Sequence, residues 1–238
     1  MAQNLKRAAI GLGLLAAFLL LIAGPGTRLG LWEYGTGFLL MRVAFFAGLA
    51  TAALALLLLA LPKTRAAGAA PLAVALLLGL AVAWVPFSGV QKARSLPFIH
   101  DISTDTQNPP QFVAVVPLRA DAPNPPQYPG EEVAAQQREG YPDIDTLTLA
   151  MPVAQAFERA LEVAQGLGWE IIAAEAAEGR IEATDTTFWF GFKDDVVIRI
   201  EDAAGGSRLD IRSKSRVGRS DVGANAARIR DFRSALLD

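Results

Sequence analysis

The chain has 238 residues, of which 52% are hydrophobic, and a formal net charge of −2. It contains no cysteine, which excludes a disulfide framework, a thiolate nucleophile and any cysteine-ligated metal. The segment through Arg94 holds eight lysines and arginines against Glu33 alone, a net of +7, so the remainder carries −9. A basic first part suits anionic lipid headgroups, whereas the acidic remainder argues against nonspecific binding of nucleic acid.

Three apolar runs lie near the start of the chain, at Ile10–Ile22, Phe38–Leu61 and Ala69–Val85. A helix needs roughly 20 apolar residues to cross about 30 Å of hydrocarbon. The second run meets that length, and the other two are near the lower limit. We therefore predict a transmembrane region over residues 1–90, with helices at about 8–23, 38–61 and 69–87, then a tether over 91–98 and a soluble domain over 99–238.

Basic residues beside the apolar runs predict the orientation in the membrane. Lys6 and Arg7 precede the first run, and Lys63 and Arg65 lie between the second and third. Cytoplasmic loops carry an excess of lysine and arginine, so three crossings place the soluble domain on the periplasmic side of a bacterial inner membrane. In an alternative interpretation the first run is a cleavable signal peptide, although the residues after Ile22 form a poor cleavage site.

Proline dominates the beginning of the predicted soluble domain. Asn108-Pro109-Pro110 is followed by Asp121–Pro129, which holds four prolines. Proline lacks a backbone donor and fixes φ, so these segments are predicted to be extended or looped. We expect them to wrap the domain surface, with a short strand at Phe112–Val116 between them.

The pattern becomes regular from Tyr141 onward. Apolar positions at helical spacing predict one helix from Pro152 to Gly166 and an amphipathic closing helix at Ala224–Leu237. Alternating runs predict an extended segment at Thr146–Leu149, a hairpin of Trp169–Ala174 with Arg180–Thr184, and a second hairpin of Asp195–Asp202 with Ser207–Val217. The predicted fold class is α+β, an antiparallel sheet of four or more strands with two helices against one face, after an all-α region of three membrane helices.

The strands of the second hairpin alternate, so the two faces of the sheet differ. One face carries Val196, Ile198, Ile200, Leu209, Ile211 and Val217. The other carries Val197, Arg199, Glu201, Arg208, Asp210, Arg212, Lys214 and Arg216. We predict that helices cover the apolar face and that the charged face presents a ladder of mixed charge, including Glu182, whose cross-strand pairs contribute about 0.2–1 kcal/mol each.

The segment between the last predicted strand and the last helix is rich in cations. Arg212–Asn225 has four cations, several hydroxyl groups and two glycines. Because helix N-termini favour anions, the pattern indicates a site for an anionic ligand or lipid headgroup made by Lys214, Arg216, Arg219 and Ser220. The alternative is that Arg212 to Arg216 form a solvated strand face paired to nearby acids, while Ser220 or Asp221 only caps the helix.

An aromatic cluster precedes the second hairpin, at Phe188, Trp189, Phe190 and Phe192. With Gly191 among them, these rings cannot all face one side of a regular strand, so either the strand bulges or some rings contact an external apolar partner. A lipid tail, the bilayer surface or a partner helix would serve, which makes Phe188, Trp189 and Phe192 candidates for ligand binding. The alternative is that alternate rings enter the core and the others pack under the proline-rich segments.

Signatures of catalysis are mostly missing. His100 is the only histidine, which excludes a multi-histidine metal centre. A Ser–His–Asp arrangement would have to use this residue, which lies near the predicted tether. The acid pairs Asp101 with Asp105 and Asp143 with Asp145 lack the pattern of a calcium loop. No phosphate-cradling loop of the Walker or dinucleotide type is found. We name no catalytic residue and expect no metal or cofactor.

Several stretches of the soluble part carry a family resemblance. They are Ile99–Asp105, Asn108–Pro110, Tyr141–Ile144, Ile181–Thr186, Phe190–Val196 and Arg212–Asp221. In these stretches the chain resembles a bacterial family catalogued as a domain of unknown function, DUF1499, over about Pro97 to Leu237. The resemblance implies N-terminal membrane spans but no established activity and no known catalytic residue. Some relatives have a cysteine near the beginning of the domain, and its absence here rules out a thiol role or lipid attachment at that place.

Taken with the apolar runs, these features lead us to expect a membrane-anchored envelope protein with a noncatalytic module that binds an anionic or amphipathic ligand such as lipid. Its expected partners are the bilayer and, as an alternative, another membrane protein. A hydrolase or transferase acting on an envelope component is a rival, and would use acids such as Asp185, Asp194 or Asp195. A structural role beside a membrane protein is a third alternative, indicated by Gly48 and the small residues Ala44, Ala47 and Thr51.

Overall fold

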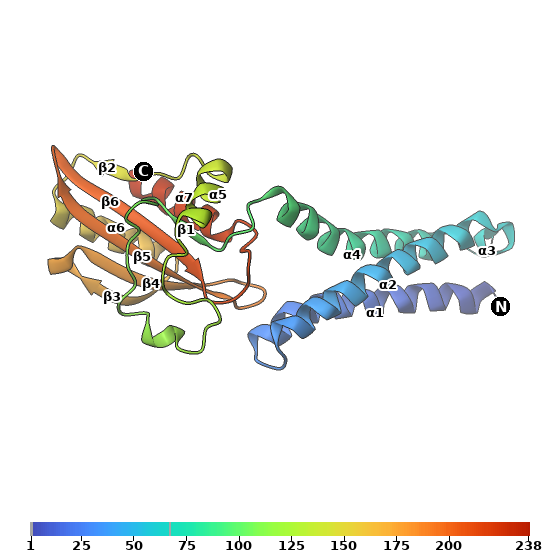
Figure 1. Ribbon diagram of the computed structural model, residues 1–238. Helices are drawn as coiled ribbons and strands as arrows, with labels where there is room; N and C mark the ends of the chain where they lie inside the picture. The colour runs from blue at the N-terminus through green and yellow to red at the C-terminus, as the bar shows by residue number, and fades with distance from the viewer. Residues whose placement is uncertain (1, 67) are drawn as a thin grey trace. The chain divides into compact units, whose positions relative to one another are not determined.

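The structure is a computed structural model that describes residues 2–66 and 68–238 (Figure 1). It divides into two compact units. The first, here called the helical unit, comprises Met1–Lys92 with Phe188–Gly191, and the second, the C-terminal domain, comprises Ala93–Thr187 with Phe192–Asp238.

The helical unit contains three long apolar helices, as predicted. Helices α1 (Ala2–Arg28), α2 (Tyr34–Ala60) and α4 (Ala70–Ser95) are each long and apolar enough to cross a membrane, and a short helix α3 (Pro62–Ala66) follows α2. Helix α4 extends further than expected, so residues 91–95 of the segment predicted as a tether are helical. Gln91, Lys92, Ala93 and Arg94 are good helix formers, and Pro97 stops the helix soon after them.

Small residues let α2 and α4 approach each other closely. A Cβ atom on Gly48 would lie 2.8 Å from the carbonyl oxygen of Gly79, and one on Gly79 would lie 2.5 Å from that of Gly48. Ala44 and Thr51 on the same helix are fully buried. The small-residue face of α2 is therefore used, at least in this part, for packing within the chain.

The C-terminal domain is built on a six-stranded antiparallel sheet, which confirms the predicted α+β class. Its strands are β1 (Asp101–Ser103), β2 (Leu147–Leu149), β3 (Glu170–Glu175), β4 (Arg180–Thr186), β5 (Lys193–Ala203) and β6 (Gly206–Ser215). The order is β1-β6-β5-β4-β3, and β2 also pairs with β6. Both predicted hairpins are present, and β1 is an additional strand of three residues.

Two helices cover the apolar face of this sheet, as the alternation predicted. Helices α6 (Val153–Gly166) and α7 (Ala224–Leu237) lie behind the sheet in Figure 1. Their buried side chains join those of the strands in one core, in which the Trp169 ring stacks on Phe232 with centroids 5.5 Å apart. Val217 does not belong to this core, because β6 ends at Ser215.

The unpredicted helix α5 (Glu131–Gly140) supports the edge strand β1. Gln137 Nε2 donates to the carbonyl oxygen of Ser103 at 2.6 Å, and its Oε1 accepts from the Ser103 N–H at 2.9 Å. One side-chain amide therefore satisfies both backbone groups of a residue at the sheet edge.

Candidate functional site

Much of the charged face of the sheet is buried, whereas the sequence pattern indicated a solvated ladder of charge. The ladder reaches solvent near the turn between β5 and β6, where Glu201 is exposed and Arg208 is half-buried. Asp101, Glu182, Asp195, Asp210 and Arg212 are each 0% exposed. Residues 104–130, here called the proline-rich cover, lie over this face and are green in Figure 1. The expected strand at Phe112–Val116 is wrong: this part of the cover is a turn that leads into the 3-10 helix η1 (Pro117–Arg119).

Lys214, a predicted ligand contact, is part of a buried ionic triad with Asp101 and Arg212. Arg212 donates to both oxygens of Asp101, from Nε at 2.9 Å and from Nη2 at 2.8 Å, and Lys214 Nζ lies 3.0 Å from Asp101 Oδ2. Lys214 also donates to the Gln127 carbonyl oxygen at 2.7 Å. Burial lowers the pKa of Lys214, an effect that Asp101 opposes. The ammonium group of Lys214 is thus engaged inside the domain.

The cover supplies the remaining contacts of the Arg212 guanidinium. The carbonyl oxygens of Pro110 and Pro126 accept its N–H groups at 3.1 and 2.9 Å. The rings of Phe112 and Tyr128 lie 4.8 and 5.3 Å from its central carbon. Burial, together with the charge of Asp101, raises the pKa of Tyr128 to about 12. The cation is therefore held by carbonyl dipoles and aromatic faces in place of water.

Arg216, the second predicted contact, belongs to a neighbouring cluster around Asp195. Its Nε and Nη2 donate to Asp195 at 2.9 and 2.8 Å. Arg119 from the cover donates to the same carboxylate at 2.5 Å, and Thr184 Oγ1 donates at 2.7 Å. Arg216 Nη1 also donates to the Leu118 carbonyl oxygen at 3.0 Å. The carboxylate of Asp195 thus joins the cover to strands β4 and β5.

The carboxylate of Glu182 occupies an anion-binding turn in the cover. It accepts the backbone N–H groups of three consecutive residues, Val113 at 3.0 Å, Ala114 at 2.9 Å and Val115 at 3.0 Å. Successive N–H groups that converge in this way form a nest for a negative charge. The nest is filled by the domain's own side chain, which also forms an ion pair with Arg180. This arrangement explains why the segment is a turn.

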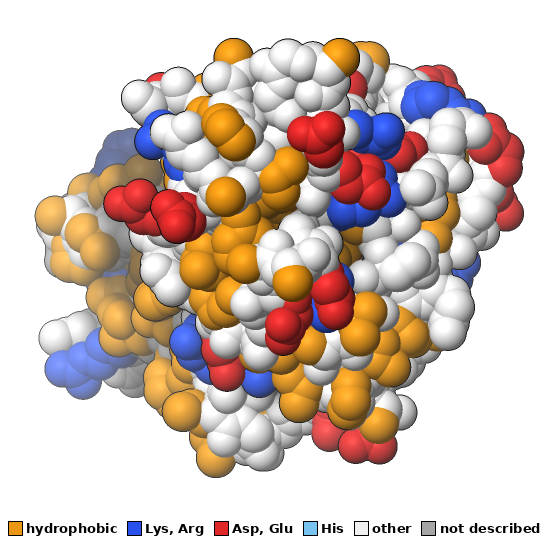
Figure 2. Space-filling model, turned by 90° about the vertical axis from the view of Figure 1, so that its left-hand side faces the viewer, with side chains coloured by type: hydrophobic (Ala, Val, Ile, Leu, Met, Phe, Trp, Pro, Cys, Tyr) orange, Lys and Arg blue, Asp and Glu red, His pale blue; other side chains and the backbone are white. Residues whose placement is uncertain are grey.

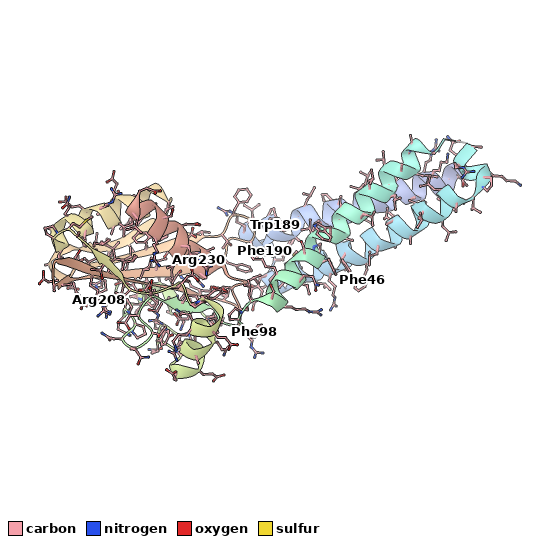
Figure 3. The ribbon with its side chains drawn as sticks, turned by 90° about the horizontal axis from the view of Figure 1, so that it is seen from above. Phe46, Phe98, Trp189, Phe190, Arg208 and Arg230 are labelled. Atoms are coloured by element: carbon pink, nitrogen blue, oxygen red, sulfur yellow. The ribbon has the colours of Figure 1, made fainter. Side chains whose placement is uncertain are left out.

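A further ionic cluster joins the beginning of the cover to β5 and β6. Asp210 Oδ2 accepts from Arg199 at 2.8 Å and from Arg208 at 2.9 Å, and Thr104 Oγ1 donates to its other oxygen at 3.0 Å. Asp105 pairs with the same two arginines, of which Arg208 is labelled in Figure 3. Burial opposes ionisation of Asp105, but hydrogen bonds and these cations outweigh it and lower its pKa.

Arg219 and Ser220, the other two predicted anion contacts, lie in the connection between β6 and α7. Arg219 is exposed, and its guanidinium carbon lies 5.3 Å from the centre of the Phe98 ring, which is 58% exposed (Figure 3). The Ser220 hydroxyl accepts the Val222 N–H at 3.3 Å. Asp221 caps α7 by accepting from the N–H groups of Gly223 and Asn225. Two of the four predicted residues are thus held by buried carboxylates, and the other two lie in this connection.

His100 lies beside this connection. Its Nδ1 is 3.3 Å from the carbonyl oxygen of Arg219. Burial lowers the pKa of His100, and the nearby Lys214 contributes in the same direction. The imidazole is therefore held toward its neutral form at the base of the Arg219 loop.

The aromatic candidates are separated from one another. Trp189 packs with apolar residues of the helical unit, and the Phe190 ring lies 5.1 Å from that of Phe38 (Figure 3). Phe188 is 91% exposed, and its carbonyl oxygen accepts from Arg28 at 2.7 Å. Phe192 belongs to the C-terminal domain, where its N–H donates to Thr187 Oγ1 at 2.8 Å.

Arg228, which sequence analysis missed, organises a polar cluster at the start of α7. It donates to Asp185 at 2.8 Å, to Asp194 at 2.7 Å, to Ser213 at 3.0 Å and to Asn225 at 2.7 Å. Burial raises the pKa of Asp194, and Arg228 opposes this effect. The available signal was the spacing of Asn225 and Arg228, three residues apart on one side of the closing helix.

On the face seen in Figure 2, acidic and basic side chains are interspersed among hydrophobic ones, so this face carries no large patch of one charge. The loop acids are paired: Asp143 accepts from Arg230 at 2.6 and 2.7 Å, and Asp145 accepts from Arg233 at 2.9 Å. Within residues 2–66 and 68–238, no group of three or more histidine or acidic side chains is arranged to hold a metal ion.

A family model described as "Protein of unknown function (DUF1499)" matches residues 101–236. This match confirms the resemblance seen in the short stretches of the soluble part. No curated protein and no solved structure matches the chain.

Proposed function

The chain belongs to the DUF1499 family of proteins of unknown function, and from that premise we propose that it is a noncatalytic lipid-binding protein of the bacterial cell envelope. Its three apolar helices anchor it in the inner membrane. Its C-terminal domain lies on the periplasmic side and binds an anionic or amphipathic ligand, namely the headgroup region of a phospholipid.

The observation that carries this proposal is the exposed pair of Arg219 and Phe98 at the point where the chain enters the domain. Helix α4 ends at Ser95 and β1 begins at Asp101. The five residues between them extend over at most about 20 Å. Arg219 contacts Phe98 inside this linker, so the covalent structure alone keeps both residues within reach of a bilayer that α4 crosses.

The register of the sheet adds a second exposed cation to the same end. Asp101 is opposite Lys214 near the end of β6, and Asp194 is opposite Ser215. Lys193, the first residue of β5, therefore lies at the end of the sheet where the linker enters, and it is exposed. A lysine or arginine close to an anionic bilayer contributes about 1 kcal/mol of attraction, and an aromatic ring suits the headgroup level.

The internal ion pairs support Arg219 over Lys214 and Arg216 in this role. Lys214 and Arg216 are bound to Asp101 and Asp195, and releasing them would leave two buried carboxylates uncompensated. The anionic ligand is therefore assigned to Arg219 and Lys193, with Phe98 as the apolar contact.

The rival function, a hydrolase or transferase, needs an acid that can exchange a proton with a substrate. Asp194 has the raised pKa of such an acid, but it is 2% exposed and bound to Arg228. Asp195 is 0% exposed and is held by two arginines. These contacts favour binding over catalysis.

The test uses the full chain in nanodiscs of phosphatidylcholine, with and without phosphatidylglycerol. Hydrogen exchange of residues 96–100 and 216–222 should slow when the anionic lipid is present. Arg219→Glu should abolish this protection, whereas the control Arg219→Lys, which keeps the positive charge, should retain it. Equal protection in both variants would refute the assignment.

The orientation is tested separately by adding protease to sealed spheroplasts. The C-terminal domain should be digested together with a periplasmic marker protein. Protection of the domain while the marker is digested would place it on the cytoplasmic side.

A further inference from the structure

A cavity of about 200 Å³ lies in the C-terminal domain beside the Arg228 cluster. It is bounded by the turn after α6, the end of β4 and the first three turns of α7. Trp169, Asp185, Arg228 and Asp231 supply its larger side chains, and two alanines of α7 leave the space open. Its lining does not include Arg219 or Phe98, so this cavity is separate from that pair.

The charge of Arg228 is balanced before any ligand enters. Its Nε, Nη1 and Nη2 groups donate to Asp185, Asp194, Ser213 and Asn225. Two of these acceptors, Asp185 and Asp194, are carboxyl groups paired with the guanidinium, so its positive charge is compensated. An anion entering the cavity would find these donors occupied and would meet negative charge.

The cavity also presents acceptors that remain open. Arg228 contacts only the Oδ2 atom of Asp185. Asp231 is exposed and takes part in none of the ion pairs formed by the described residues. The N-terminus of α7 does not offset this negative field, because the Asp221 carboxylate caps it with bonds of 2.8 and 3.0 Å.

An aromatic wall completes the arrangement. Trp169 lines the cavity and is fixed by stacking on Phe232. Indole is the aromatic side chain that attracts cations most strongly. Carboxylate oxygens beside a fixed indole are the combination that recognises an alkylated ammonium group.

We propose that this cavity binds a small organic ammonium ion, with the charged nitrogen near Asp185 and Asp231 and the hydrocarbon part against Trp169. A cavity of about 150 Å³ accommodates benzene, so this one takes a cation of about six to eight non-hydrogen atoms, the size of choline. The ammonium ion is either a free amine or the headgroup of a zwitterionic lipid.

The test is calorimetric titration of the full chain in maltoside detergent, which contains no ammonium group. Choline should bind, and its uncharged isostere 3,3-dimethylbutan-1-ol should bind at least about tenfold more weakly. If both bind equally, or neither binds, the proposal is overturned.

Two variants locate the binding. Asp231→Asn removes a surface charge that forms none of the ion pairs of the described residues, and the lost attraction should weaken choline binding about tenfold. Glu162→Gln, which removes an exposed charge from α6, should leave it unchanged. Equal affinity in the two variants would overturn the proposal, because the charge of Asp231 would then make no difference.

The source of the cation is resolved by short-chain dihexanoyl phosphatidylcholine, titrated below its micelle concentration. Tighter binding than choline, with the same loss in Asp231→Asn, supports the proposal with a lipid headgroup as the occupant. Equal or weaker binding supports it with a free amine. Neither result depends on Arg219, so the lipid-surface function can fail while this cavity is confirmed.

Discussion

The centres of both faces of the domain sheet are buried, but different interactions stabilise them. On one face, Ile198 and Ile211 pack under α6 and α7. On the other, Arg212 and Asp195 are as fully buried as those isoleucines. The apolar face is covered by regular helices, because side chains alone can fill the space. The charged face is covered by irregular chain, whose backbone groups provide the hydrogen bonds that buried ions require.

Proline suits such a cover for a chemical reason. Each proline keeps its carbonyl acceptor but has no N–H donor. A proline-rich segment therefore offers more acceptors than donors, and the carbonyls of Pro110, Pro126 and Gln127 accept from Arg212 and Lys214. A strand face that is charged in the sequence therefore does not by itself indicate contact with water.

The largest expected effect comes from breaking the ionic triad. Arg212→Met leaves Asp101 buried beside a single cation and should destabilise the domain by about 3–5 kcal/mol. Replacing all three members, as Asp101→Leu, Arg212→Met and Lys214→Met, should cost far less, because no uncompensated charge remains. Hydrogen exchange of β6 in the full chain measures both. A single variant as stable as the wild type would show that the triad is not structural.

The second largest loss of stability is expected when the carboxylate of Glu182 is removed from the nest in the proline-rich cover. Glu182→Gln keeps the shape of the side chain but removes its charge, and should cost about 1.5–3 kcal/mol because three N–H groups lose a charged acceptor. The amides of Val113, Ala114 and Val115 should exchange faster, while those of α6 keep their protection. Uniform loss across the whole domain would contradict the local role assigned to Glu182.

A conservative substitution on the apolar face provides a reference for the stability losses expected on the charged face. Ile211→Val, one residue before Arg212, removes a single methylene group and should cost about 0.5–1.5 kcal/mol. Exchange of β6 in the same preparation measures it directly. A cost equal to that of Arg212→Met would remove the distinction between the two faces.

The smallest effect is the titration of His100, next to the charged face. Burial lowers its pKa below 6.5 in the folded protein. The folded state therefore binds the proton less readily than the unfolded state, so stability is full above pH 6.5 and falls as pH drops toward the folded pKa. Since the chain has one histidine, its NMR titration needs no assignment. A pKa above 6.5 would reverse the sign, and His100→Gln should abolish this dependence.

Much of the fold was predictable, because in the second half of the domain the spacing of apolar residues and the positions of turn-forming residues indicate the same elements. The alternation of Val196 to Ile200 gave the strand and its buried face, and Gly205 and Gly206 marked the turn. Strand β1 was not predictable, because three residues are too short for a period. The turn at Val113 was missed because its apolar residues favour a strand, while the carboxylate of Glu182, about 70 residues away, determines the backbone.

The site was less predictable than the fold. Sequence reasoning recognised Lys214 and Arg216 as cations on one strand, but their acidic partners come from other parts of the chain and only tertiary structure brings them together. Arg219 was named as a cation of the last connection, and its position over Phe98 depends on a loop pairing with no sequence signature. Trp169 and Asp231 lie far apart in the sequence, and no pattern of residue spacing predicts that they line the same cavity.

Strand β6 has ten residues, yet its outer side is occupied by two pieces, β1 and β2, of three residues each. They arrive from separate parts of the chain, and Gln137 saturates the end of one of them. An incoming strand from another molecule would find no continuous row of free donors and acceptors at this edge. In a crowded membrane, where copies diffuse in two dimensions, such a fragmented border disfavours strand addition at this edge, whereas the opposite edge is the continuous strand β3.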